Sequence, residues 1–473
     1  MDAEAFQRHG HALVDWIAAY LNNTERYPVL SRKQPGEIRD SIPATPPELG
    51  VPFDEIFNDF EQVILPGITH WNHPGFFGYF AISGSSAGVL AEFLSAALNV
   101  QAMLWRTSPS ATELEEVTLG WLRQLLGLPD TFEGVIYDTA SVASLHALAA
   151  ARHRAVPDIR TRGLANRPDV GPLRLYASDH AHSSIDKAVM TLGFGHDALT
   201  KIPVDTNFRM QPEALQTAIH TDRANGVTPV AVVATVGTTS TTSIDPVGQI
   251  ADLCNDERLW LHVDAAYAGA AAVVPDTHDI LDGCADADSV VINPHKWLFT
   301  PFDLSAFYCR HMDTVRAAFS LTPEYLKTPE AGRVRNLMDT GIQLGRRFRA
   351  LKLWAVIRHF GSNGLRDRIA EHIRLARLFA DWVDASTEFE RLAPVPLSVV
   401  CFRACGTGND IDINDLNARL LDRVNATGKV FLSHTRLDGL YTIRLAIGHI
   451  RTTEVHVRLA WELLNNIRRE LVC

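Results

Sequence analysis

The sequence predicts an α/β protein with a large, mostly parallel β-sheet covered by helices on both faces. Two observations predict this class. Short apolar runs typical of buried strands alternate with helix patterns from about residue 85 to about residue 350, and strands separated by helices form parallel sheets. Long helices and then further strands follow. We therefore expect an N-terminal helical segment (residues 1–84), a large α/β domain (85–350) and a smaller C-terminal α+β domain (351–473).

The N-terminal region opens with a predicted amphipathic helix. Apolar residues recur at helical spacing from Phe6 to Leu21. The apolar face is broad for a terminal helix, so we expect it to pack on another unit or subunit. Five prolines between Pro35 and Pro52 then predict an extended connector that is not helical.

The remaining elements follow from apolar periodicity and turn residues. Residues 152–172 are rich in Arg, Pro and Gly and predict an exposed loop. Asp438-Gly439 predicts a hairpin turn, and Thr452 and Thr453 open a final helix. The predicted helices of the large domain lie at 86–98, 111–126, 142–151, 213–223 and 247–257, and the predicted strands of the chain at 134–137, 173–177, 230–236, 259–264, 289–292, 398–403, 430–433 and 441–446.

Length and composition restrict the class of protein. A chain of 473 residues exceeds the usual limit of one hydrophobic core. A formal charge of -11 argues against nucleic acid or an anionic membrane as a partner. The first residues lack the basic start and apolar core of a signal peptide, no run of about twenty apolar residues appears, and the six cysteines show no metal or disulfide framework. We expect a cytoplasmic protein.

Two segments carry the chemistry. Lys296 follows the apolar run 290–292, and Asp264 ends the predicted strand 259–264. Pyridoxal phosphate needs a lysine to hold its aldehyde as a Schiff base and a carboxylate to keep its pyridine nitrogen protonated. Ligands of open parallel sheets bind at the carboxyl ends of the strands, and the two-residue period of a strand puts Trp260, His262 and Asp264 on one face. The pair predicts a pyridoxal-phosphate enzyme.

Other groups complete the predicted cofactor site. Ala140 and Ser141 stand between a strand and a helix, where backbone N–H groups and a hydroxyl suit a phosphate. Thr239, after another strand, could reach the cofactor. One of His180 and His182 could stack on the pyridine ring. Two close histidines also suggest a metal, but no third ligand is near, and we expect none.

Several motifs in the same order resemble the group II pyridoxal-phosphate decarboxylases, specifically the aromatic-L-amino-acid decarboxylases. The resemblance covers nearly the whole chain and implies a fold-type I enzyme. It also implies an obligate homodimer with swapped N-terminal helices and active sites at the interface. The motifs are Thr69–Trp71 with Phe76–Phe80, Ser108–Glu115, Ala181–Ser184, Leu261–Gly269, Asn293–Trp297 and Leu344–Arg349.

The resemblance also implies roles for individual residues. Lys296 would be the Schiff-base lysine, Asp264 the pyridinium partner and His182 the stacking histidine. Further cofactor contacts would come from Ala140, Ser141, Thr239, Ala266, Asn293 and His295. The wall of the substrate pocket would come from Trp71, Tyr79, Phe80 and, across the dimer interface, Met103. An aromatic L-amino acid would lose carbon dioxide and leave as the amine.

One position departs from the family pattern. Counting back from Leu344-Gly345-Arg346, Leu337 stands where the family has a tyrosine that protonates the reaction intermediate. A positioned general acid contributes about 10²–10⁴ in rate. In relatives without this tyrosine the outcome resembles oxidative deamination to an aldehyde, so that product is the alternative. His182 or a water could instead supply the proton.

Two other classes stay open. One is a catalytically weak cofactor-binding homologue. The other is an aminotransferase or aldolase, which needs an arginine for the substrate carboxylate. Arg444 is a candidate for that arginine, although its strand could place it in a structural ion pair.

Overall fold

The computed structural model describes residues 1–330, 332–406 and 410–472 and confirms the predicted α/β class. The chain forms two compact units. The central unit comprises Ile82–Arg377 and Ala393–Cys401. The terminal unit comprises Met1–Ala81, Leu378–Leu392 and Phe402–Cys473.

The central unit is built on a seven-stranded sheet in the part of the chain that the structure describes, with the strand order β2-β8-β7-β6-β5-β3-β4. Strands β7, β6, β5, β3 and β4 pair in parallel, whereas β8 runs antiparallel to both β7 and β2. The mostly parallel sheet is therefore confirmed. Its strands are β2 (Glu133–Tyr137), β3 (Leu173–Ser178), β4 (Leu199–Ile202), β5 (Thr228–Thr235), β6 (Trp260–Asp264), β7 (Ser289–Ile292) and β8 (Ser305–Cys309).

Strands β4 and β8 were not predicted. β4 (Leu-Thr-Lys-Ile) contains two polar residues, and β8 (Ser-Ala-Phe-Tyr-Cys) is bounded by polar residues without a regular alternation, so neither has a clear apolar strand pattern. The other five strands of this sheet match the predicted runs within two residues at each end.

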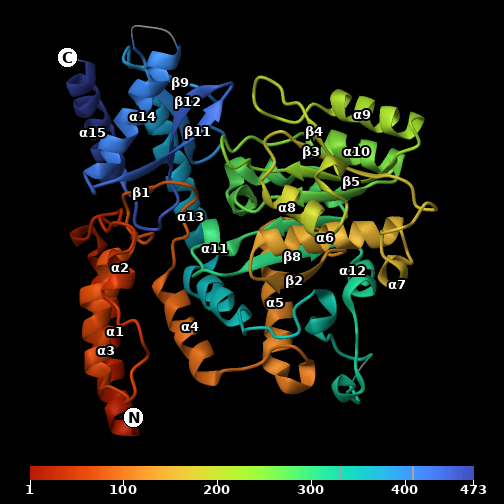
Figure 1. Ribbon diagram of the computed structural model, residues 1–473, viewed down its shortest axis with the longest axis horizontal. Helices are drawn as coiled ribbons and strands as arrows, with labels where there is room; N and C mark the ends of the chain where they lie inside the picture. The colour runs from red at the N-terminus through yellow and green to blue at the C-terminus, as the bar shows by residue number, and fades with distance from the viewer. Residues whose placement is uncertain (331, 407–409, 473) are drawn as a thin grey trace. The chain divides into compact units, whose positions relative to one another are not determined.

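Helices cover both faces of this sheet, as Figure 1 shows for α6 and α10. On one face of the sheet, side chains such as Ala231 and Val233 of β5 pack in a buried cluster with residues of α6 and α8. Helices α9 and α10 pack together and contact β5. The helices are α4 (Ser86–Leu98), α5 (Pro109–Leu125), α6 (Ala140–Ala155), α7 (Ile159–Arg162), α8 (Ser184–Thr191), α9 (Pro212–Ala224), α10 (Val247–Glu257), α11 (Pro294–Trp297), α12 (Met312–Phe319) and α13 (Ala350–Asp384), whose last residues belong to the terminal unit.

Two predicted irregular segments contain helices. The connector rich in proline holds the single turn α2 (Glu37–Asp40), which fits between Pro35 and Pro43 without either ring entering it. The predicted loop 152–172 is wrong at its start, because α6 continues to Ala155 and α7 follows. Arg167 then bonds to Asp158 and Asp169 and so orders the rest of the segment.

The terminal unit combines a five-stranded sheet, in the order β1-β11-β12-β10-β9, with helices. Residues Asp438 and Gly439 have positive φ angles of 49° and 83° and form the predicted hairpin turn between β11 and β12. The elements are α1 (Ala3–Asn22), α2, α3 (Phe53–Asp59), β1 (Phe76–Phe77), β9 (Phe389–Arg391), β10 (Val399–Ala404), which begins within the central unit, α14 (Asp410–Ala426), β11 (Phe431–Leu437), β12 (Leu440–Ala446) and α15 (Glu454–Val472).

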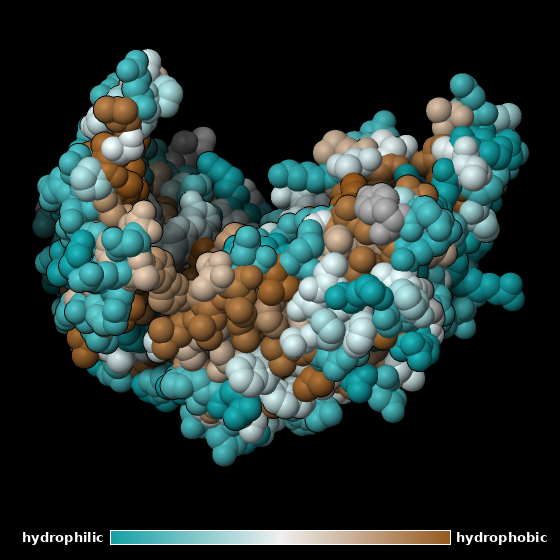
Figure 2. All heavy atoms as spheres, turned by 90° about the horizontal axis from the view of Figure 1, so that it is seen from below, coloured by the Kyte–Doolittle hydropathy of each residue, from teal (hydrophilic) through white to brown (hydrophobic). Residues whose placement is uncertain are grey.

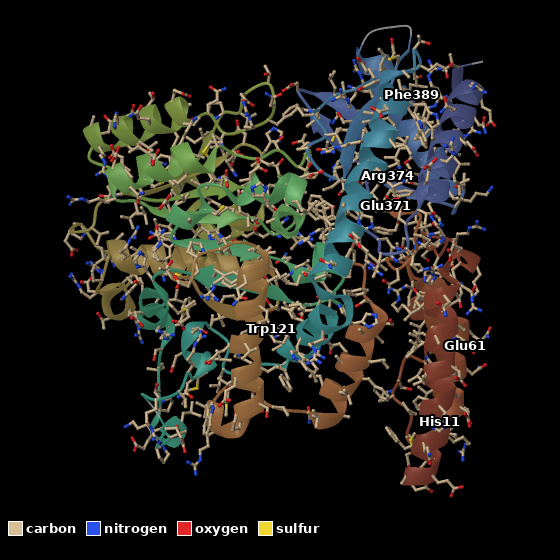
Figure 3. All side chains as sticks on the ribbon, turned by 180° about the vertical axis from the view of Figure 1, so that it is seen from behind. His11, Glu61, Trp121, Glu371, Arg374 and Phe389 are labelled. Carbon is tan, nitrogen blue, oxygen red and sulfur yellow. The ribbon has the colours of Figure 1, made fainter. Side chains whose placement is uncertain are left out.

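Helix α1 is held to the segment after α3 by an aromatic side chain. The Trp16 indole N–H donates to the Glu61 carboxylate at 2.9 Å, and its ring lies 5.3 Å from that of Phe60. Glu61 is labelled in Figure 3. No residue of α1 is buried, so much of its apolar face stays uncovered.

Candidate active site

The candidate active site lies in the central unit, at the carboxyl ends of its parallel strands. Strand β7 ends at Ile292 and leads through Asn293 into the short helix α11, which carries Lys296. The Lys296 backbone N–H donates to the Asn293 carbonyl at 2.9 Å, which begins this turn. Strand β6 ends at Asp264, whose partner in register on β7 is Val291. The two predicted groups therefore project from adjacent strand ends.

Burial sets the protonation of the groups around Lys296. It lowers the pKa of the Lys296 ammonium, and the negative charge of Asp264 partly opposes this. Burial also lowers the pKa of His182, with Asp264 raising it and Lys296 lowering it. The structure thus brings together the three predicted catalytic residues. A lowered pKa favours the neutral amine, which is the form of lysine that attacks an aldehyde.

Backbone hydrogen bonds fix the orientation of Asp264 and the lysine turn together. The Ala266 N–H donates to Asp264 Oδ1 at 3.1 Å, and the Ala266 carbonyl accepts from the Asn293 N–H at 2.9 Å. The Asn293 side-chain oxygen accepts from the Ser305 hydroxyl at 2.6 Å. Ala266 and Asn293 therefore couple the carboxylate to the segment that carries Lys296.

His262 is a buried residue of β6 that makes structural hydrogen bonds. Its Nε2 lies 3.0 Å from the Ser144 hydroxyl of α6, and its Nδ1 lies 2.9 Å from the Ser289 hydroxyl of β7. The Trp260 indole N–H also donates to the Ser289 hydroxyl at 3.0 Å. Burial lowers the pKa of His262 to about 4. The contacts confirm that Trp260 and His262 share one face of β6, the face that carries α6.

The lysine turn rests on a stacked aromatic pair that the sequence did not single out. The Trp297 and Tyr267 rings lie 4.6 Å apart at an interplanar angle of 4°. The Trp297 indole N–H donates to His372 Nδ1 at 2.9 Å. His295, on the same turn, accepts from the Leu304 N–H at 2.9 Å through Nδ1, and burial lowers its pKa to about 3. These contacts hold α11 rigidly and leave Lys296 as its reactive group.

The N-terminus of α6 is a suitable phosphate site. Thr139, the residue before Ala140, has extended backbone geometry and makes no side-chain cap, so the first N–H groups of a sixteen-residue helix remain for a ligand. Ala140 and Ser141, which were predicted to lie between the strand and the helix, are the first two residues of this helix. The Gln343 amide donates to the Asp138 carboxylate at 3.0 Å. Sequence reasoning missed Gln343, because 205 residues separate it from Asp138.

A buried hydroxyl at the end of β5 supports the presence of a ligand. Thr235 is paired in register with Asp264, and its hydroxyl has no hydrogen-bond partner among the described residues. Its backbone N–H donates to Asp245 at 2.7 Å. Thr239, the predicted contact, lies exposed in the turn that follows. A buried hydroxyl without a partner is costly, so Thr235 is the better candidate for a ligand contact on this strand.

The residues predicted to form the substrate wall lie in both units. In the terminal unit, the rings of Trp71 and Tyr79 stack at 5.7 Å, and Trp71 also lies 4.3 Å from Phe76. Phe80 turns toward a different neighbour, since the Arg444 guanidinium lies 5.6 Å from its ring.

The two other residues singled out from the sequence have separate surroundings. Met103, in the central unit, packs against a small cluster of Leu104, Leu326 and Met338. Arg444 is buried and donates to the Ser433 hydroxyl at 3.0 Å.

Leu337 occupies a core position. It begins a 3-10 helix over Leu337–Thr340, and its side chain is 2% exposed within the cluster beneath α6. The Tyr137 hydroxyl donates to the Thr340 carbonyl, and the Ile342 N–H donates to His146 at 3.3 Å. In this arrangement the side chain at position 337 packs within the unit.

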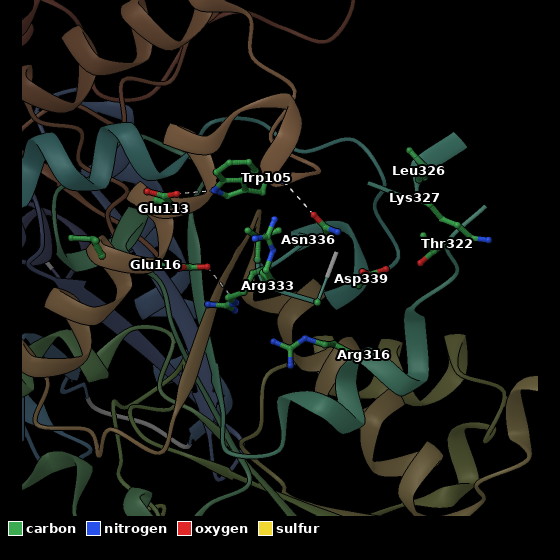
Figure 4. A pocket seen from close by; sticks show the side chains of 14 residues that line it. Trp105, Glu113, Glu116, Arg316, Thr322, Leu326, Lys327, Arg333, Asn336 and Asp339 are labelled. Atoms are coloured by element: carbon green, nitrogen blue, oxygen red, sulfur yellow. Dashed lines mark hydrogen bonds and ion pairs between the residues drawn. The ribbon is translucent and has the colours of Figure 1, made fainter. Parts of the chain in front are cut away.

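Figure 4 shows the pocket that borders this segment. It is lined on one side by Trp105 and on the other by residues such as Arg333 and Asn336. The Asn336 side-chain oxygen accepts the Trp105 backbone N–H at 3.3 Å.

Among the described residues, no group of three or more His, Cys, Asp or Glu side chains is arranged to hold a metal ion. No described helix is both long and apolar enough to cross a membrane.

The donor set fits pyridoxal phosphate: a lysine with a lowered pKa, a carboxylate on the neighbouring strand, an uncapped helix N-terminus and an unpaired buried hydroxyl. The chain matches the model of the pyridoxal-dependent decarboxylase conserved domain over residues 35–405 and belongs to that family. The predicted cofactor and the predicted reaction class, pyridoxal-phosphate-dependent decarboxylation, are thereby confirmed.

Particular relatives are similar over the whole chain. An aromatic-L-amino-acid decarboxylase of Catharanthus roseus is 38% identical over 100% of this chain and 95% of its own length. A phenylacetaldehyde synthase of Arabidopsis thaliana is 40% identical over 98% of this chain and 96% of its own. The crystal structure of Oryza sativa TDC with PLP and tryptamine has a TM-score of 0.96 at 36% identity, covering 100% of this chain and 99% of that one.

Proposed function

We propose that this chain decarboxylates an aromatic L-amino acid to the corresponding amine and carbon dioxide. The observation that carries the proposal is the buried group of Lys296, Asp264 and His182 at the carboxyl ends of parallel strands. Bound pyridoxal phosphate supplies an electron sink for the electron pair left when carbon dioxide departs.

The residues of the site divide the remaining work. Lys296 offers a neutral amine to hold the cofactor, because burial lowers its pKa. Asp264, oriented by the Ala266 N–H, would supply the carboxylate that keeps the pyridine nitrogen protonated. The N–H groups of Ala140 and Ser141 would hold the phosphate, with Thr235 as an added hydroxyl contact. Removing such preorganised electrostatic groups typically costs about 3–4 kcal/mol of transition-state stabilisation.

Further contacts would come from residues around this core. Thr239 and His295 would line the cofactor site beside Ala266 and Asn293. His295 already accepts a backbone N–H through Nδ1, so only its Nε2 is left for such a contact.

His182 is the proposed source of the proton that reaches the substrate Cα. Its Nδ1 lies 3.2 Å from the Ser184 N–H, which donates to it, so the neutral ring carries its proton on Nε2. Burial keeps the pKa of His182 below its usual value, so the resting ring is neutral. To give a proton to Cα, His182 would first take one up to become imidazolium, and it would then return to the neutral ring that burial favours. No tyrosine at position 337 is then required.

An aromatic substrate fits the proposed wall. Trp71 and Tyr79 present stacked rings, and aromatic pairs favour such offset contacts. Phe80 and, from the partner subunit of a dimer, Met103 would complete an apolar surface. The relative from Catharanthus roseus is named for aromatic L-amino acids, which supports the same substrate class.

Oxidative deamination to an aromatic aldehyde is the second candidate product. It is favoured by Leu337, which can neither donate nor accept a proton, and by the similarity to a phenylacetaldehyde synthase. A catalytically weak cofactor-binding protein is a third possibility. It predicts cofactor absorption without release of carbon dioxide.

A cytoplasmic homodimer is part of the proposal. Helix α4 exposes four large apolar side chains, and Figure 2 shows hydrophobic residues gathered over this part of the central unit. Contiguous apolar surface of this kind marks an interaction site. The uncovered apolar face of α1 suits the proposed exchange of residues 1–84 between subunits. The exposed residues of α4 are Leu90, Phe93, Leu94 and Leu98.

Product analysis tests the proposed reaction. The purified protein with pyridoxal phosphate is offered L-Trp, L-Phe, L-Tyr and L-dopa separately in air, and amine, aldehyde, peroxide and carbon dioxide are measured. Amine and carbon dioxide without peroxide support the proposal. Aldehyde with stoichiometric peroxide would mean that the reaction is oxidative deamination. Cofactor absorption without release of carbon dioxide would mean that the chain is a catalytically weak cofactor-binding protein.

A further inference from the structure

An open cavity of about 410 Å³ lies at the surface of the terminal unit, and no residue discussed for catalysis lines it. Four segments distant in sequence form it: residues 25–32, residues 73–75, the turn at 427–430 before β11, and α15. Backbone hydrogen bonds hold these segments together. The Val29 N–H donates to the Gly428 carbonyl at 2.8 Å, and the Phe431 N–H donates to the Gly75 carbonyl at 3.0 Å.

Three cations line this cavity without a carboxylate partner. Arg26, Arg32 and Lys429 form no ion pair with any of residues 1–330, 332–406 or 410–472. The Arg26 guanidinium lies 4.7 Å from the Tyr27 ring, and Arg32 reaches the Thr427 carbonyl at 3.5 Å. Most arginines of this acidic chain are paired, so three unpaired cations around one cavity concentrate positive charge there.

The acidic residue of the cavity does not cancel this charge. Glu25 forms an ion pair with Arg451 at 2.7 Å, and its remaining neighbour is His456 at 3.8 Å. Arg451 thus neutralises Glu25. The positive charges of the other three side chains remain available.

A buried histidine adds a hydrogen-bond donor. His73 is 4% exposed and lines the cavity. Its Nδ1 accepts the Gly75 N–H at 2.8 Å, which leaves the proton of the neutral ring on Nε2. Burial lowers the pKa of His73 to about 4. No hydrogen bond from this Nε2–H to another described residue is found, and His73 lines the cavity, so this N–H can donate to a ligand there.

We infer that this cavity binds a small anion that carries phosphate groups, held by Arg26, Arg32, Lys429 and the His73 Nε2–H. Guanidinium groups bind phosphate oxygens in pairs, and lysine adds a point charge. The volume of about 410 Å³ suits a small molecule. The net charge of -11 argues against a nucleic acid as the ligand.

The test uses the holoenzyme, in which the cofactor already fills its own phosphate site. Isothermal titration calorimetry with inorganic pyrophosphate, at an ionic strength kept constant with KCl, should show saturable binding. The cofactor absorption should not change during the titration. Each charge-assisted contact is worth about 1.5–3 kcal/mol, or about tenfold or more in affinity. The variant Arg32→Gln/Lys429→Gln should therefore bind about a hundredfold more weakly.

A matched variant controls for overall charge. Arg419→Gln/Arg436→Gln removes two exposed cations from the same unit, outside this cavity, and should bind like the wild type. Equal weakening by both variants, or no saturable heat with the wild type, would overturn the inference. Tighter binding of citrate than of pyrophosphate would also overturn it, because the site would then recognise carboxylates.

Discussion

The most decisive stability prediction concerns the buried ion pair of Glu115 and Arg346 in the central unit. Their side chains are 3% and 4% exposed, and Arg346 Nη2 lies 2.7 Å from Glu115 Oε1. The same guanidinium donates to the Ile136 carbonyl at 2.7 Å and to the Ala102 carbonyl at 3.3 Å. Glu115 in turn accepts the Ile136 N–H at 2.8 Å. The pair thus joins α5, β2 and the backbone next to Met103.

Arg346→Met should destabilise the protein strongly. The change leaves a buried carboxylate without its cation, which costs about 3–5 kcal/mol. At about 2.1 cal/mol/K of unfolding entropy per residue, a unit of about 300 residues shifts its Tm by about 1.6 °C per kcal/mol, so the Tm of the holoenzyme should fall by roughly 5–8 °C. Glu115→Gln keeps an acceptor for the Ile136 N–H and loses only the charge, so its cost should be smaller, about 1.5–3 kcal/mol.

The assay is thermal unfolding at one scan rate, since unfolding of a chain of this size is often irreversible. The adjacent residue provides the control. Arg347 is 57% exposed and pairs with Glu92 at the surface, so Arg347→Met should cost no more than about 1 kcal/mol. If Arg346→Met melted within 2 °C of Arg347→Met, the buried pair would not hold these elements together, and the reasoning would be refuted.

Four further predictions follow from the site and the surface. Lys296→Ala should abolish both the absorption of the lysine-bound cofactor and turnover; residual turnover would contradict its role. Because burial lowers the pKa of His262 to about 4, from an unfolded value of about 6.5, the unfolded state binds more protons in this range. Stability should then fall as the pH drops from about 6.5 to about 4, and His262→Gln should flatten that fall in urea titrations at each pH. Leu337→Tyr should lower the Tm, since overpacking costs about 1–3 kcal/mol; if the wild type makes aldehyde, amine formation by this variant would show that position 337 selects the product. Leu94→Glu on α4 should convert the proposed dimer to monomer in sedimentation, and an unchanged dimer would place the interface elsewhere.

Much of the central unit was predictable because its strands and helices are local patterns. Strands β5 and β7 are buried on both faces and therefore contain continuous apolar runs. The segment after β7 is similarly recognisable, because Lys296 follows a buried strand directly. Strand-end positions are the points at which a parallel sheet presents side chains to a ligand. The cofactor class followed from two such positions.

Other features depend on contacts between distant parts of the chain. Leu337 has no local signal for burial, and only its packing beneath α6 shows it to be a core residue. Gln343 reaches Asp138 across 205 residues. Thr235 was one of several threonines in the sequence, and the absence of a partner for its hydroxyl among the described residues distinguishes it from Thr239.

The sequence alone therefore determined the α/β class, the lysine and carboxylate of the site and the cofactor that they serve, because each depends on the order of residues along a strand or at its end. The tertiary structure decided which side chains are buried, neutral or paired. Burial that lowers the pKa of Lys296 and the cavity around His73 arise from segments that meet only in the folded chain. Desolvation depends on all the atoms around a group, and no short stretch of sequence contains them.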